Sequence, residues 1–424
     1  MERKRSLTHV GGGVSAVGDS KLSVALAYAL DVTPAAPPTG GEGAEEEDRA
    51  HVHGFHTYPA RMHPETAARL IGALASPNDT IFDPFCGSGT VLVEAAIARA
   101  RAYGTDLNPL AIRLASLKCN YYGDPWLKAL HAEAIKAAEV ATYRREQKSG
   151  ASHRYPDSDM QLFSPHVLLE LDGLAVGIAH AEEEMRPALE LVLSAILVKV
   201  SQKRSDTTRQ VSQRRIAAGY TTKLFVKKAV ELCERMKQFR SLVKSAPQIQ
   251  VGIDNATRLE TVPEDAVDLV VTSPPYAATY DYYAHHELRF RWLNLDARTL
   301  ESRELGARRT YSRTESIRAA RDLWFTELTA TLRALEPTLR EGAKVVLLMA
   351  DSAIHGEALR ADASVEAAAR ETGFNLVAAA SQSRPHFHMP TMRAFEKAPR
   401  REHLLLLERD RGQSHHSLED PPAV

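Results

Sequence analysis

The chain has 424 residues, and at about 150 residues per domain this length is typical of two or three domains. Hydrophobic residues make up 44% and charged residues 25% of the sequence, which excludes collagen-like, fibrous and wholly disordered proteins. The 53 Lys and Arg residues and 54 Asp and Glu residues leave a net charge of −1, so any basic surface for nucleic acid must be local.

Cysteine content and hydropathy favour a cytoplasmic protein. The three cysteines, Cys86, Cys119 and Cys233, are too few and too scattered for a disulfide framework. No apolar run approaches the roughly 20 residues that a membrane-spanning helix needs, so no membrane partner is expected. A glycine-rich stretch separates the basic start MERKR from the first apolar run, which argues against a signal peptide.

In chain order, residues 1–50 contain a Pro/Gly-rich run that ends in acidic residues, a composition that predicts a disordered leader. A βαβ pattern follows in residues 51–120. Its predicted elements are a helix over 64–75, a strand over 80–83, a glycine turn, a helix over 90–100 and a strand over 101–106. This order is typical of the first half of a doubly wound sheet.

The alternation stops over residues 121–247, where Ala-, Leu-, Glu- and Lys-rich segments predict helices. Further strands are predicted over 249–254, 266–273, 344–351, 375–380 and 403–408. We therefore expect one α/β fold, a three-layer doubly wound Rossmann-like sheet, formed by residues 51–120 and 248–410 and interrupted by a long helical insertion. The polar residues 411–424 are expected to form a disordered tail.

A glycine turn, DPFCGSGT, joins the first strand of this pattern to the following helix. Gly87 and Gly89 allow a ligand to approach the backbone closely, and the amides at the helix start point at its anionic group. The turn lacks the GxGxxG of dinucleotide-binding sites and the lysine of a P-loop. Cys86 is interpreted as a packing residue, because no nearby histidine marks it as an activated nucleophile. The turn therefore predicts a site for a carboxylate or phosphate.

Two acidic residues stand at the ends of later strands. From the position of Asp106, a carboxylate accepts hydrogen bonds from both hydroxyls of a ribose. The alternative for Asp106 is a helix cap before Asn108. Asp254 is a candidate acceptor for an adenine amine, with a plain turn residue as the alternative.

The sequence TSPPY at 272–276 follows a predicted strand. Pro274 and Pro275 lack amide donors and leave carbonyl groups without a local partner, so the turn favours a ligand that donates hydrogen bonds. The exocyclic amine of a nucleobase is such a donor. The Pro274 carbonyl and the Ser273 side chain are expected to hold its hydrogens while Tyr276 stacks on the ring. The alternative is a proline terminator beside a core tyrosine.

DPFCGSGT with GTD and VVTSPPY resembles the class I S-adenosylmethionine-dependent DNA amino-methyltransferases, which methylate cytosine N4 or adenine N6. The resemblance covers residues 51–120 and 248–410 and implies S-adenosylmethionine as the cofactor. The cofactor-binding residues that it implies are Tyr58, Asp83, Phe85, Gly87, Ser88, Gly89, Thr90, Asp106, Leu107, Asp254, Asn255 and Ser273. The catalytic residues that it implies are Ser273, Pro274, Pro275 and Tyr276.

Upstream, HGFHTYPARMHP resembles the segment that such enzymes place over the cofactor. Four histidines lie between His51 and His63, but no Cys or acidic ligand cluster accompanies them in the sequence, so no metal is expected. His285 and His286 receive no assignment.

Within the family, serine rather than aspartate before Pro-Pro-Tyr is more usual for enzymes that methylate cytosine N4, so N4-cytosine is favoured over N6-adenine. The motif order departs from that group, in which the catalytic turn often precedes the glycine turn. Enzymes that methylate cytosine C5 are excluded, because they need a cysteine nucleophile after a proline and no cysteine here follows one.

Basic residues gather in the predicted insertion, where twelve Lys or Arg residues between Lys199 and Arg240 outnumber three acidic residues. This composition is typical of a phosphate-contacting loop and helix, with a solvated helix face as the alternative. Phe290, Trp292 and Leu293 are expected in the core. The candidate DNA contacts are Lys203, Arg204, Arg209, Arg214, Arg215, Tyr280, Tyr282, Arg308 and Arg309.

These features predict an enzyme that methylates the exocyclic amine of a flipped base in double-stranded DNA, alone or beside a cognate restriction or defence-system protein. One alternative is an RNA base methyltransferase, because the glycine turn and its helix also resemble the guanine-N2 enzymes of tRNA. Another is a catalytically silent nucleic-acid-binding subunit that keeps the fold.

Overall fold

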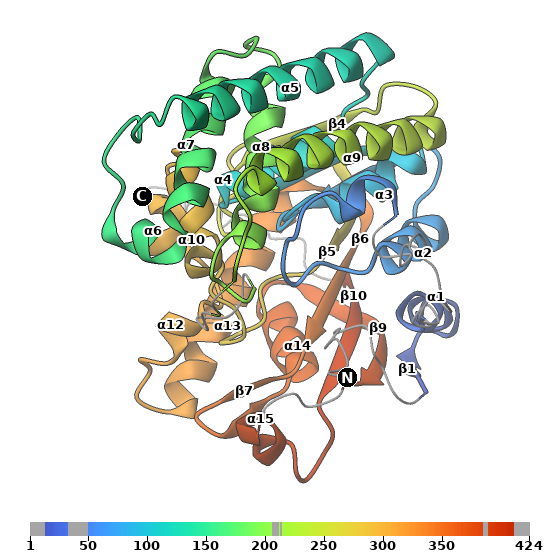
Figure 1. Ribbon diagram of the computed structural model, residues 1–424. Helices are drawn as coiled ribbons and strands as arrows, with labels where there is room; N and C mark the ends of the chain where they lie inside the picture. Colours follow the sequence, from blue (N-terminus) through green and yellow to red (C-terminus); the bar gives the residue numbers. More distant parts are fainter. Residues whose placement is uncertain (1–12, 33–49, 206–211, 213, 385–388, 411–424) are drawn as a thin grey trace, which may run out of the picture.

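Five parallel strands form the centre of the computed structural model, which describes residues 13–32, 50–205, 212, 214–384 and 389–410 (Figure 1). They are β2 (Thr80–Asp83), β3 (Arg101–Asp106), β4 (Ile249–Ile253), β5 (Val267–Thr272) and β6 (Leu339–Ala350). Beyond β6 the sheet continues through three antiparallel strands, β10 (Arg401–Arg409), β9 (Phe374–Ser383) and β1 (Ser15–Gly18). The full order is β1-β9-β10-β6-β5-β2-β3-β4.

The sheet is doubly wound, as the sequence predicted. The chain runs outward from β2 to β3 and β4 on one side, and from β5 to β6 on the other. The strand order therefore reverses between β2 and β5, which are hydrogen-bonded neighbours. In open α/β sheets, ligands bind beyond the carboxyl ends of the strands at such a reversal.

Helices cover both faces of the sheet. Alternate residues of β5 enter different cores: Leu269 and Val271 join one, and Val270 joins the other. The first core is packed by α1 (Ser20–Leu30), α2 (Pro64–Leu74), α3 (Thr90–Ile97) and α4 (Pro109–Lys118), and the second by α13 (Ile317–Leu335) and α14 (Ala361–Glu371). Burial on both faces explains the apolar runs at 269–271 in β5 and 345–350 in β6.

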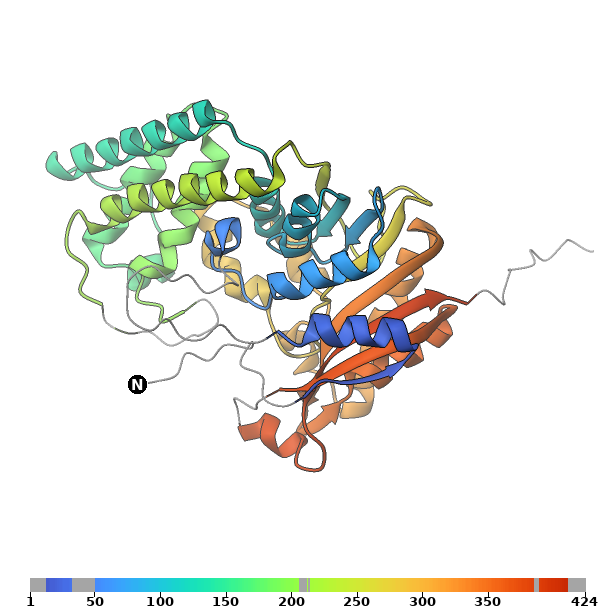
Figure 2. The same cartoon turned by 90° about the vertical axis from the view of Figure 1, so that its right-hand side faces the viewer.

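The insertion between α4 and β4 is helical in its described residues. It contains α5 (Asp124–Glu146), α6 (Asp157–Leu162), α7 (Pro165–Ala179), α8 (Arg186–Val200) and α9 (Tyr220–Val243). Figure 2 shows these teal to yellow-green helices gathered at one end of the molecule, beside the sheet. Helices α5 and α7 approach so closely that a Cβ atom on Gly177 would lie 2.6 Å from the Cα of Ala137. Helix α9 joins the insertion to the core by packing on α3 and η2 (His51–Gly54).

The remaining elements lie after residues 273–276, the turn predicted to be catalytic and called the catalytic turn below. They are α10 (Tyr282–Trp292), α11 (Arg298–Arg303), α12 (Arg308–Tyr311), η3 (Glu336–Thr338), β7 (Ser352–Ile354), β8 (Glu357–Leu359) and α15 (Met389–Ala394). Phe290 and Leu293 are buried in the core and Trp292 packs against it, as predicted. Among the described residues we find no helix with the length and apolarity needed to cross a membrane.

The prediction of a disordered leader over residues 1–50 is wrong for residues 13–32. Strand β1 pairs with β9, and the Asp19 side chain caps the start of α1 by accepting the amides of Lys21 and Leu22. Leu26 is fully buried against the sheet. The Pro/Gly-rich composition belongs to residues 33–49 alone, whereas the apolar run before them packs in the core. Residues 1–12, 33–49 and 411–424 lie outside the described part of the chain.

Candidate functional site

A pocket lies beyond the carboxyl ends of β2, β3, β4 and β5, where the strand order reverses. It encloses about 810 Å³ of space, part of which is open to solvent. Eleven of the twelve predicted cofactor-binding residues line it. These are Tyr58, Asp83, Phe85, Gly87, Ser88, Thr90, Asp106, Leu107, Asp254, Asn255 and Ser273. The parallel strands bring these side chains together, because their carboxyl ends all meet at one edge of the sheet.

The glycine turn is held against β3 by backbone contacts. The Cys86 amide donates to the Thr105 carbonyl at 3.0 Å, and the Gly87 amide donates to Asp106 Oδ2 at 2.9 Å. Gly87 has φ of +49° and Gly89 has φ of +86°, where residues with side chains are strained. Gly89 lies behind the pocket, where a Cβ atom would come 3.1 Å from the Ala115 backbone of α4. Both glycines thus allow the backbone to take a positive φ, and Gly89 also allows α4 to pack closely against the turn.

Replacing Gly87 with alanine is expected to destabilise the protein by about 1–2 kcal/mol, because an alanine at this position must adopt a strained positive φ. That atom would also lie 3.2 Å from the Cε1 atom of Tyr58 on the opposite pocket wall. Thermal unfolding measures the effect. Gly72→Ala is the matched control, since a Cβ atom at this position in α2 meets no atom within 4 Å. An equal or greater loss in the Gly72 variant would contradict the explanation.

Two carboxyl groups from the ends of β2 and β3 line the pocket, and Asp83 is buried whereas Asp106 is partly buried. Asp83 accepts a hydrogen bond from the Thr272 hydroxyl at 2.6 Å, and burial raises its pKa to about 7. Asp106 accepts the amides of Gly87 and Asn108, and burial raises its pKa to about 6 despite these hydrogen bonds. Each carboxylate oxygen has a second lone pair. Both groups can therefore accept a further hydrogen bond from a ligand.

Asp254 begins the loop after β4 and is itself held by that loop. Its Oδ1 atom accepts the Asn255 amide at 2.7 Å, and its Oδ2 atom accepts the amide and hydroxyl of Thr261 at 2.7 and 2.6 Å. The side chain is thus a turn-forming residue, the alternative that the sequence left open. It also lines the pocket, so both interpretations agree with its position.

Residues 51–63, the cover segment, form one wall of the pocket through Tyr58, Arg61 and neighbouring residues. The Asn108 side chain donates to the Tyr58 hydroxyl at 3.1 Å and lies 3.0 Å from Nδ1 of His286. The cover segment also contacts the insertion, because Nε2 of His56 lies 2.9 Å from the Ser194 hydroxyl of α8. Burial lowers the pKa of His56 well below its usual value, which keeps this ring neutral.

The catalytic turn follows β5 at the same pocket. Ser273 and Pro275 line the pocket, whereas Pro274 is buried beside them. The Ser273 hydroxyl donates to the Leu348 carbonyl of β6 at 3.2 Å. Tyr276 packs against the second core, and its hydroxyl donates to Glu402 of β10 at 3.0 Å. The predicted stacking of Tyr276 on a base stays a prediction.

Some pocket residues gave no signal in the sequence. Leu300, Glu304 and Leu305 reach the pocket from the segment around α11, more than two hundred residues after the glycine turn. Glu304 accepts the Tyr282 amide and forms an ion pair with Arg309 at 2.6 Å. No local motif connects this segment with the glycine turn. Arg61 and Met62, by contrast, lie within the cover segment that the family resemblance had singled out.

The predicted DNA contacts occupy different environments. Arg204, Arg215 and Arg308 are exposed, Lys203, Arg214 and Tyr280 are partly buried, and Arg209 lies outside the described residues. Arg309 pairs with Asp281 and Glu304, so internal carboxylates already hold its guanidinium. Tyr282 lines the pocket and stacks near Tyr58, with ring centroids 6.2 Å apart. The structure therefore separates the exposed arginines from Arg309, which is held by carboxylates, and from Tyr282, which lines the pocket.

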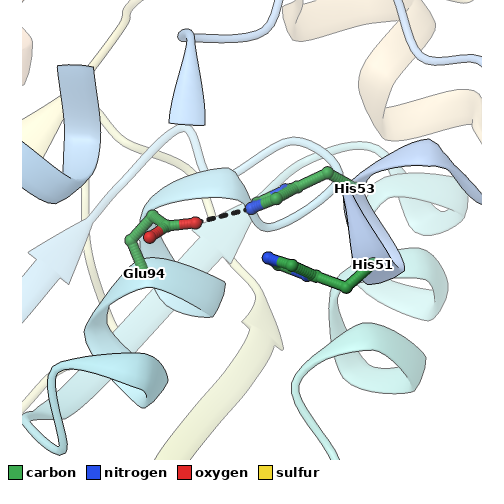
Figure 3. A group of neighbouring side chains, drawn as sticks. All are labelled: His51, His53 and Glu94. Carbon is green, nitrogen blue, oxygen red and sulfur yellow. Dashed lines mark hydrogen bonds and ion pairs between the residues drawn. The ribbon is translucent and has the colours of Figure 1, made fainter. Parts of the chain in front are cut away.

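The histidines of the cover segment have an acidic neighbour that the sequence did not indicate. Nε2 of His53 lies 2.7 Å from Oε1 of Glu94, which comes from α3, and His51 lies beside them (Figure 3). Glu94 lies 41 residues from His53 in the sequence, so the histidine segment by itself could not indicate this contact. The expectation that no metal is bound stays a prediction. Cys86 is buried and burial raises its pKa well above the usual value, which agrees with a packing role.

Comparisons with known proteins support the family resemblance. Residues 39–117 match the model of a family described as DNA methylase. The type II methyltransferase M.MvaI of Kocuria varians is 25% identical over 262 residues, which are 58% of this chain and 58% of that protein. The type II methyltransferase M.MjaII of Methanocaldococcus jannaschii is 32% identical over 87 residues, 20% of this chain and 16% of that one. The chain thus spans less than two thirds of either relative.

Among solved structures, TrmN from Thermus thermophilus is similar with a TM-score of 0.32 and 14% identity, covering 83% of this chain and 50% of that chain. The doubly wound fold is evident in the strand order of the chain itself. The glycine turn, the Ser-Pro-Pro-Tyr turn and these sequence similarities support the resemblance of this chain to the DNA amino-methyltransferases, a family whose cofactor is S-adenosylmethionine.

Proposed function

We propose that this protein transfers a methyl group from S-adenosylmethionine to the exocyclic amine of a flipped base in double-stranded DNA, with cytosine N4 favoured over adenine N6. The observation that carries the proposal is the shared pocket, in which Ser273 of the catalytic turn faces the same space as the glycine turn and Asp106. A cofactor and an amine held at these two positions are adjacent. Proximity of this kind supplies much of the rate in a single displacement.

The residues of the pocket suit the parts of this cofactor. The backbone of the glycine turn and the start of α3 receive its carboxylate end, since helix N-termini attract anions. Asp106 accepts the ribose hydroxyls, and Asp254 with Asn255 meets the adenine. The strained φ of Gly87 and its closeness to Tyr58 leave no room for a side chain between the turn and the cover segment.

The catalytic turn acts on the base. Bound S-adenosylmethionine supplies an electrophilic methyl group on its sulfonium. The Pro274 carbonyl and the Ser273 oxygen accept the hydrogens of the amine, which turns the nitrogen lone pair out of conjugation with the ring. Ser273 keeps acceptor capacity, because its hydroxyl hydrogen is directed to the Leu348 carbonyl. Serine in place of aspartate before Pro-Pro-Tyr supports cytosine N4 as the target.

The test is to express the protein in a methylation-deficient bacterial host, digest the DNA to nucleosides and analyse them by mass spectrometry. N4-methylcytosine is expected, and an Asp106→Ala variant provides the control without methylation. N6-methyladenine would retain the mechanism but change the base. If the protein binds the cofactor but both methylated nucleosides are absent, DNA is not the substrate, and the next assay uses tRNA. Failure to bind S-adenosylmethionine in calorimetry would instead indicate a silent nucleic-acid-binding subunit.

Cofactor binding is expected to weaken as the pH falls below about 6. Burial raises the pKa of Asp106 to about 6, so its carboxylate is ionised above this pH and protonated below it. Protonation removes the negative acceptor, and the affinity falls by up to about tenfold per pH unit. Calorimetric titration with S-adenosylmethionine between pH 5 and 7 measures the effect. An affinity that stays constant over this interval would show that the carboxylate does not contact the cofactor.

Exposed arginines of the insertion are expected to contribute to DNA affinity through phosphate contacts. Arg204 and Arg215 are exposed in the segment between α8 and α9. Replacing both with alanine is expected to weaken binding to all duplexes alike and to reduce the slope of log affinity against log salt by about two. Arg101→Ala is the matched control, since this exposed arginine starts β3 at the edge opposite the pocket. An equal loss of DNA affinity in the Arg101 variant would contradict the proposal that Arg204 and Arg215 lie on a DNA-binding surface.

A further inference from the structure

The His51, His53 and Glu94 side chains form a cluster outside the proposed catalytic machinery. The two histidines belong to η2 at the start of the cover segment, and the glutamate belongs to α3, which leaves the glycine turn. One potential ligand atom from each residue lies within 4.8 Å of the other two. Figure 3 shows a nitrogen of each imidazole directed toward the Glu94 carboxylate. The three donors therefore converge on one point from two separate elements.

The carboxylate in this cluster is buried without an arginine or lysine partner among the described residues. Glu94 is 8% exposed, and its ion-pair partner in the described structure is His53, which is 1% exposed. A buried carboxylate must either take up a proton or be neutralised by a cation. Neutral imidazoles are also the form that binds metal ions.

We propose that His51, His53 and Glu94 bind a zinc-class transition-metal ion that links the cover segment to α3. Two imidazole nitrogens and one carboxylate oxygen are a ligand set typical of Zn²⁺, with the fourth position left to water. Partly exposed His51 provides the side from which an ion enters. Two imidazoles disfavour Mg²⁺ and Ca²⁺, which prefer oxygen ligands.

Nearby positive charge sharpens this choice of ion. Arg61 donates to the His53 carbonyl, and Arg235 of α9 donates to the His51 carbonyl at 2.8 Å. Both guanidinium groups thus contact the backbone of η2, and Arg235 also pairs with Glu231 at 2.9 Å. Their charge opposes any dication, so only an ion with strong affinity for imidazole is expected to bind. Zn²⁺ and Co²⁺ meet this requirement, and hard cations do not.

A second cluster, Asp351, Asp362 and His403, provides an internal contrast. Asp351 already accepts the Arg360 guanidinium and the amides of Ala361 and Arg401. Nδ1 of His403 lies 2.7 Å from the Ser381 hydroxyl. These contacts satisfy the polar atoms without an ion. In the first cluster, by comparison, Nδ1 of His51 is buried and has no hydrogen-bond partner in the described structure, and the hydrogen bond of the Glu94 side chain is the one with Nε2 of His53.

The experiment measures metal content in the full chain. The protein is stripped with a chelator, equilibrated with ZnCl₂, passed through a desalting column and analysed by elemental mass spectrometry. We expect one Zn²⁺ per chain in the wild type and its loss in His51→Ala and Glu94→Gln. Asp362→Asn is the matched control and is expected to keep the ion. In a parallel titration with CoCl₂, a tetrahedral site is expected to produce visible absorption in the wild type and not in His51→Ala.

His51→Ala is the decisive variant, because the His51 side chain is partly exposed and its loss is expected to disturb folding least of the three. Circular dichroism checks that the variant is folded. Zn²⁺ is expected to raise the Tm of the wild type and leave that of this variant unchanged. Wild-type protein without stoichiometric Zn²⁺ would overturn the proposal, as would Zn²⁺ retained by the folded His51→Ala variant. None of these readouts depends on methyl transfer, so the result is independent of the proposed function.

Discussion

Replacing Asp106 with alanine is expected to weaken S-adenosylmethionine binding by at least about a hundredfold, near 3 kcal/mol. The variant loses the acceptor proposed for the ribose hydroxyls. It also removes the partner of the Gly87 amide at 2.9 Å and of the Asn108 amide at 2.8 Å. Two amides that shape the pocket are then left without their acceptor, so the turn loses its preorganised geometry. Isothermal titration calorimetry measures the affinity directly.

Two further variants separate ligand contact from folding. Asp106→Asn keeps the size of the side chain but loses its negative charge, and it is expected to weaken binding less than alanine. Asp268→Asn is the matched control, because Asp268 lies near the amino end of β5, away from the pocket, where it accepts the Thr80 amide. Comparable loss of cofactor affinity in the Asp268 variant would indicate a general effect on the sheet and contradict a specific role of Asp106.

The Ser273→Ala variant is expected to lower kcat by about 30-fold, near 2 kcal/mol, while the Kd for S-adenosylmethionine changes by less than about twofold. The Ser273 oxygen is proposed to hold a hydrogen of the target amine as the nitrogen attacks, an interaction that matters most in the transition state. Its hydroxyl is already directed to the Leu348 carbonyl of β6. Removing the Ser273 hydroxyl is therefore expected to lower the rate of methyl transfer more than the affinity for the cofactor. Single-turnover methylation of duplex DNA measures the change.

The control for this prediction is Ser302→Ala, an exposed serine of α11, which is expected to leave kcat unchanged. Tyr276→Phe tests the neighbouring contact, because it removes the hydroxyl that donates to Glu402 and keeps the ring. If the Ser273 variant lost cofactor affinity and turnover in equal measure, Ser273 would belong to the cofactor site and not to the catalytic step.

The strands and the first helices of the core were predictable because their signals are local. The strands predicted over 80–83 and 101–106 coincide with β2 and β3, and the predicted helix at 64–75 ends one residue after α2. Strands buried on both faces produce short apolar runs, and the turn residues after them produce the motifs. Asp83 and Asp106 end two of the predicted strands, and Ser273 lies at the end of a third. Because parallel strands align their carboxyl ends, these positions predict that the three residues share a pocket.

Long-range contacts were decided only by the tertiary structure. Glu304 reaches the pocket and pairs with Arg309, which the sequence assigned to DNA, because the segment around α11 folds back over the catalytic turn. Composition could not distinguish an arginine held by carboxylates from an exposed one, since both have the same local sequence signal.

Two further features follow the same physical logic. Strand β1 is ordered because β9 offers it an edge to pair with, although the run after it suggested disorder. Glu94 meets His51 and His53 only because α3 packs beside the cover segment. The sequence by itself determined the sheet, the glycine turn and the acidic strand ends, all of which depend on short-range patterns. The tertiary structure decided which distant side chains meet, because burial and ion pairing depend on distances in space and not along the chain.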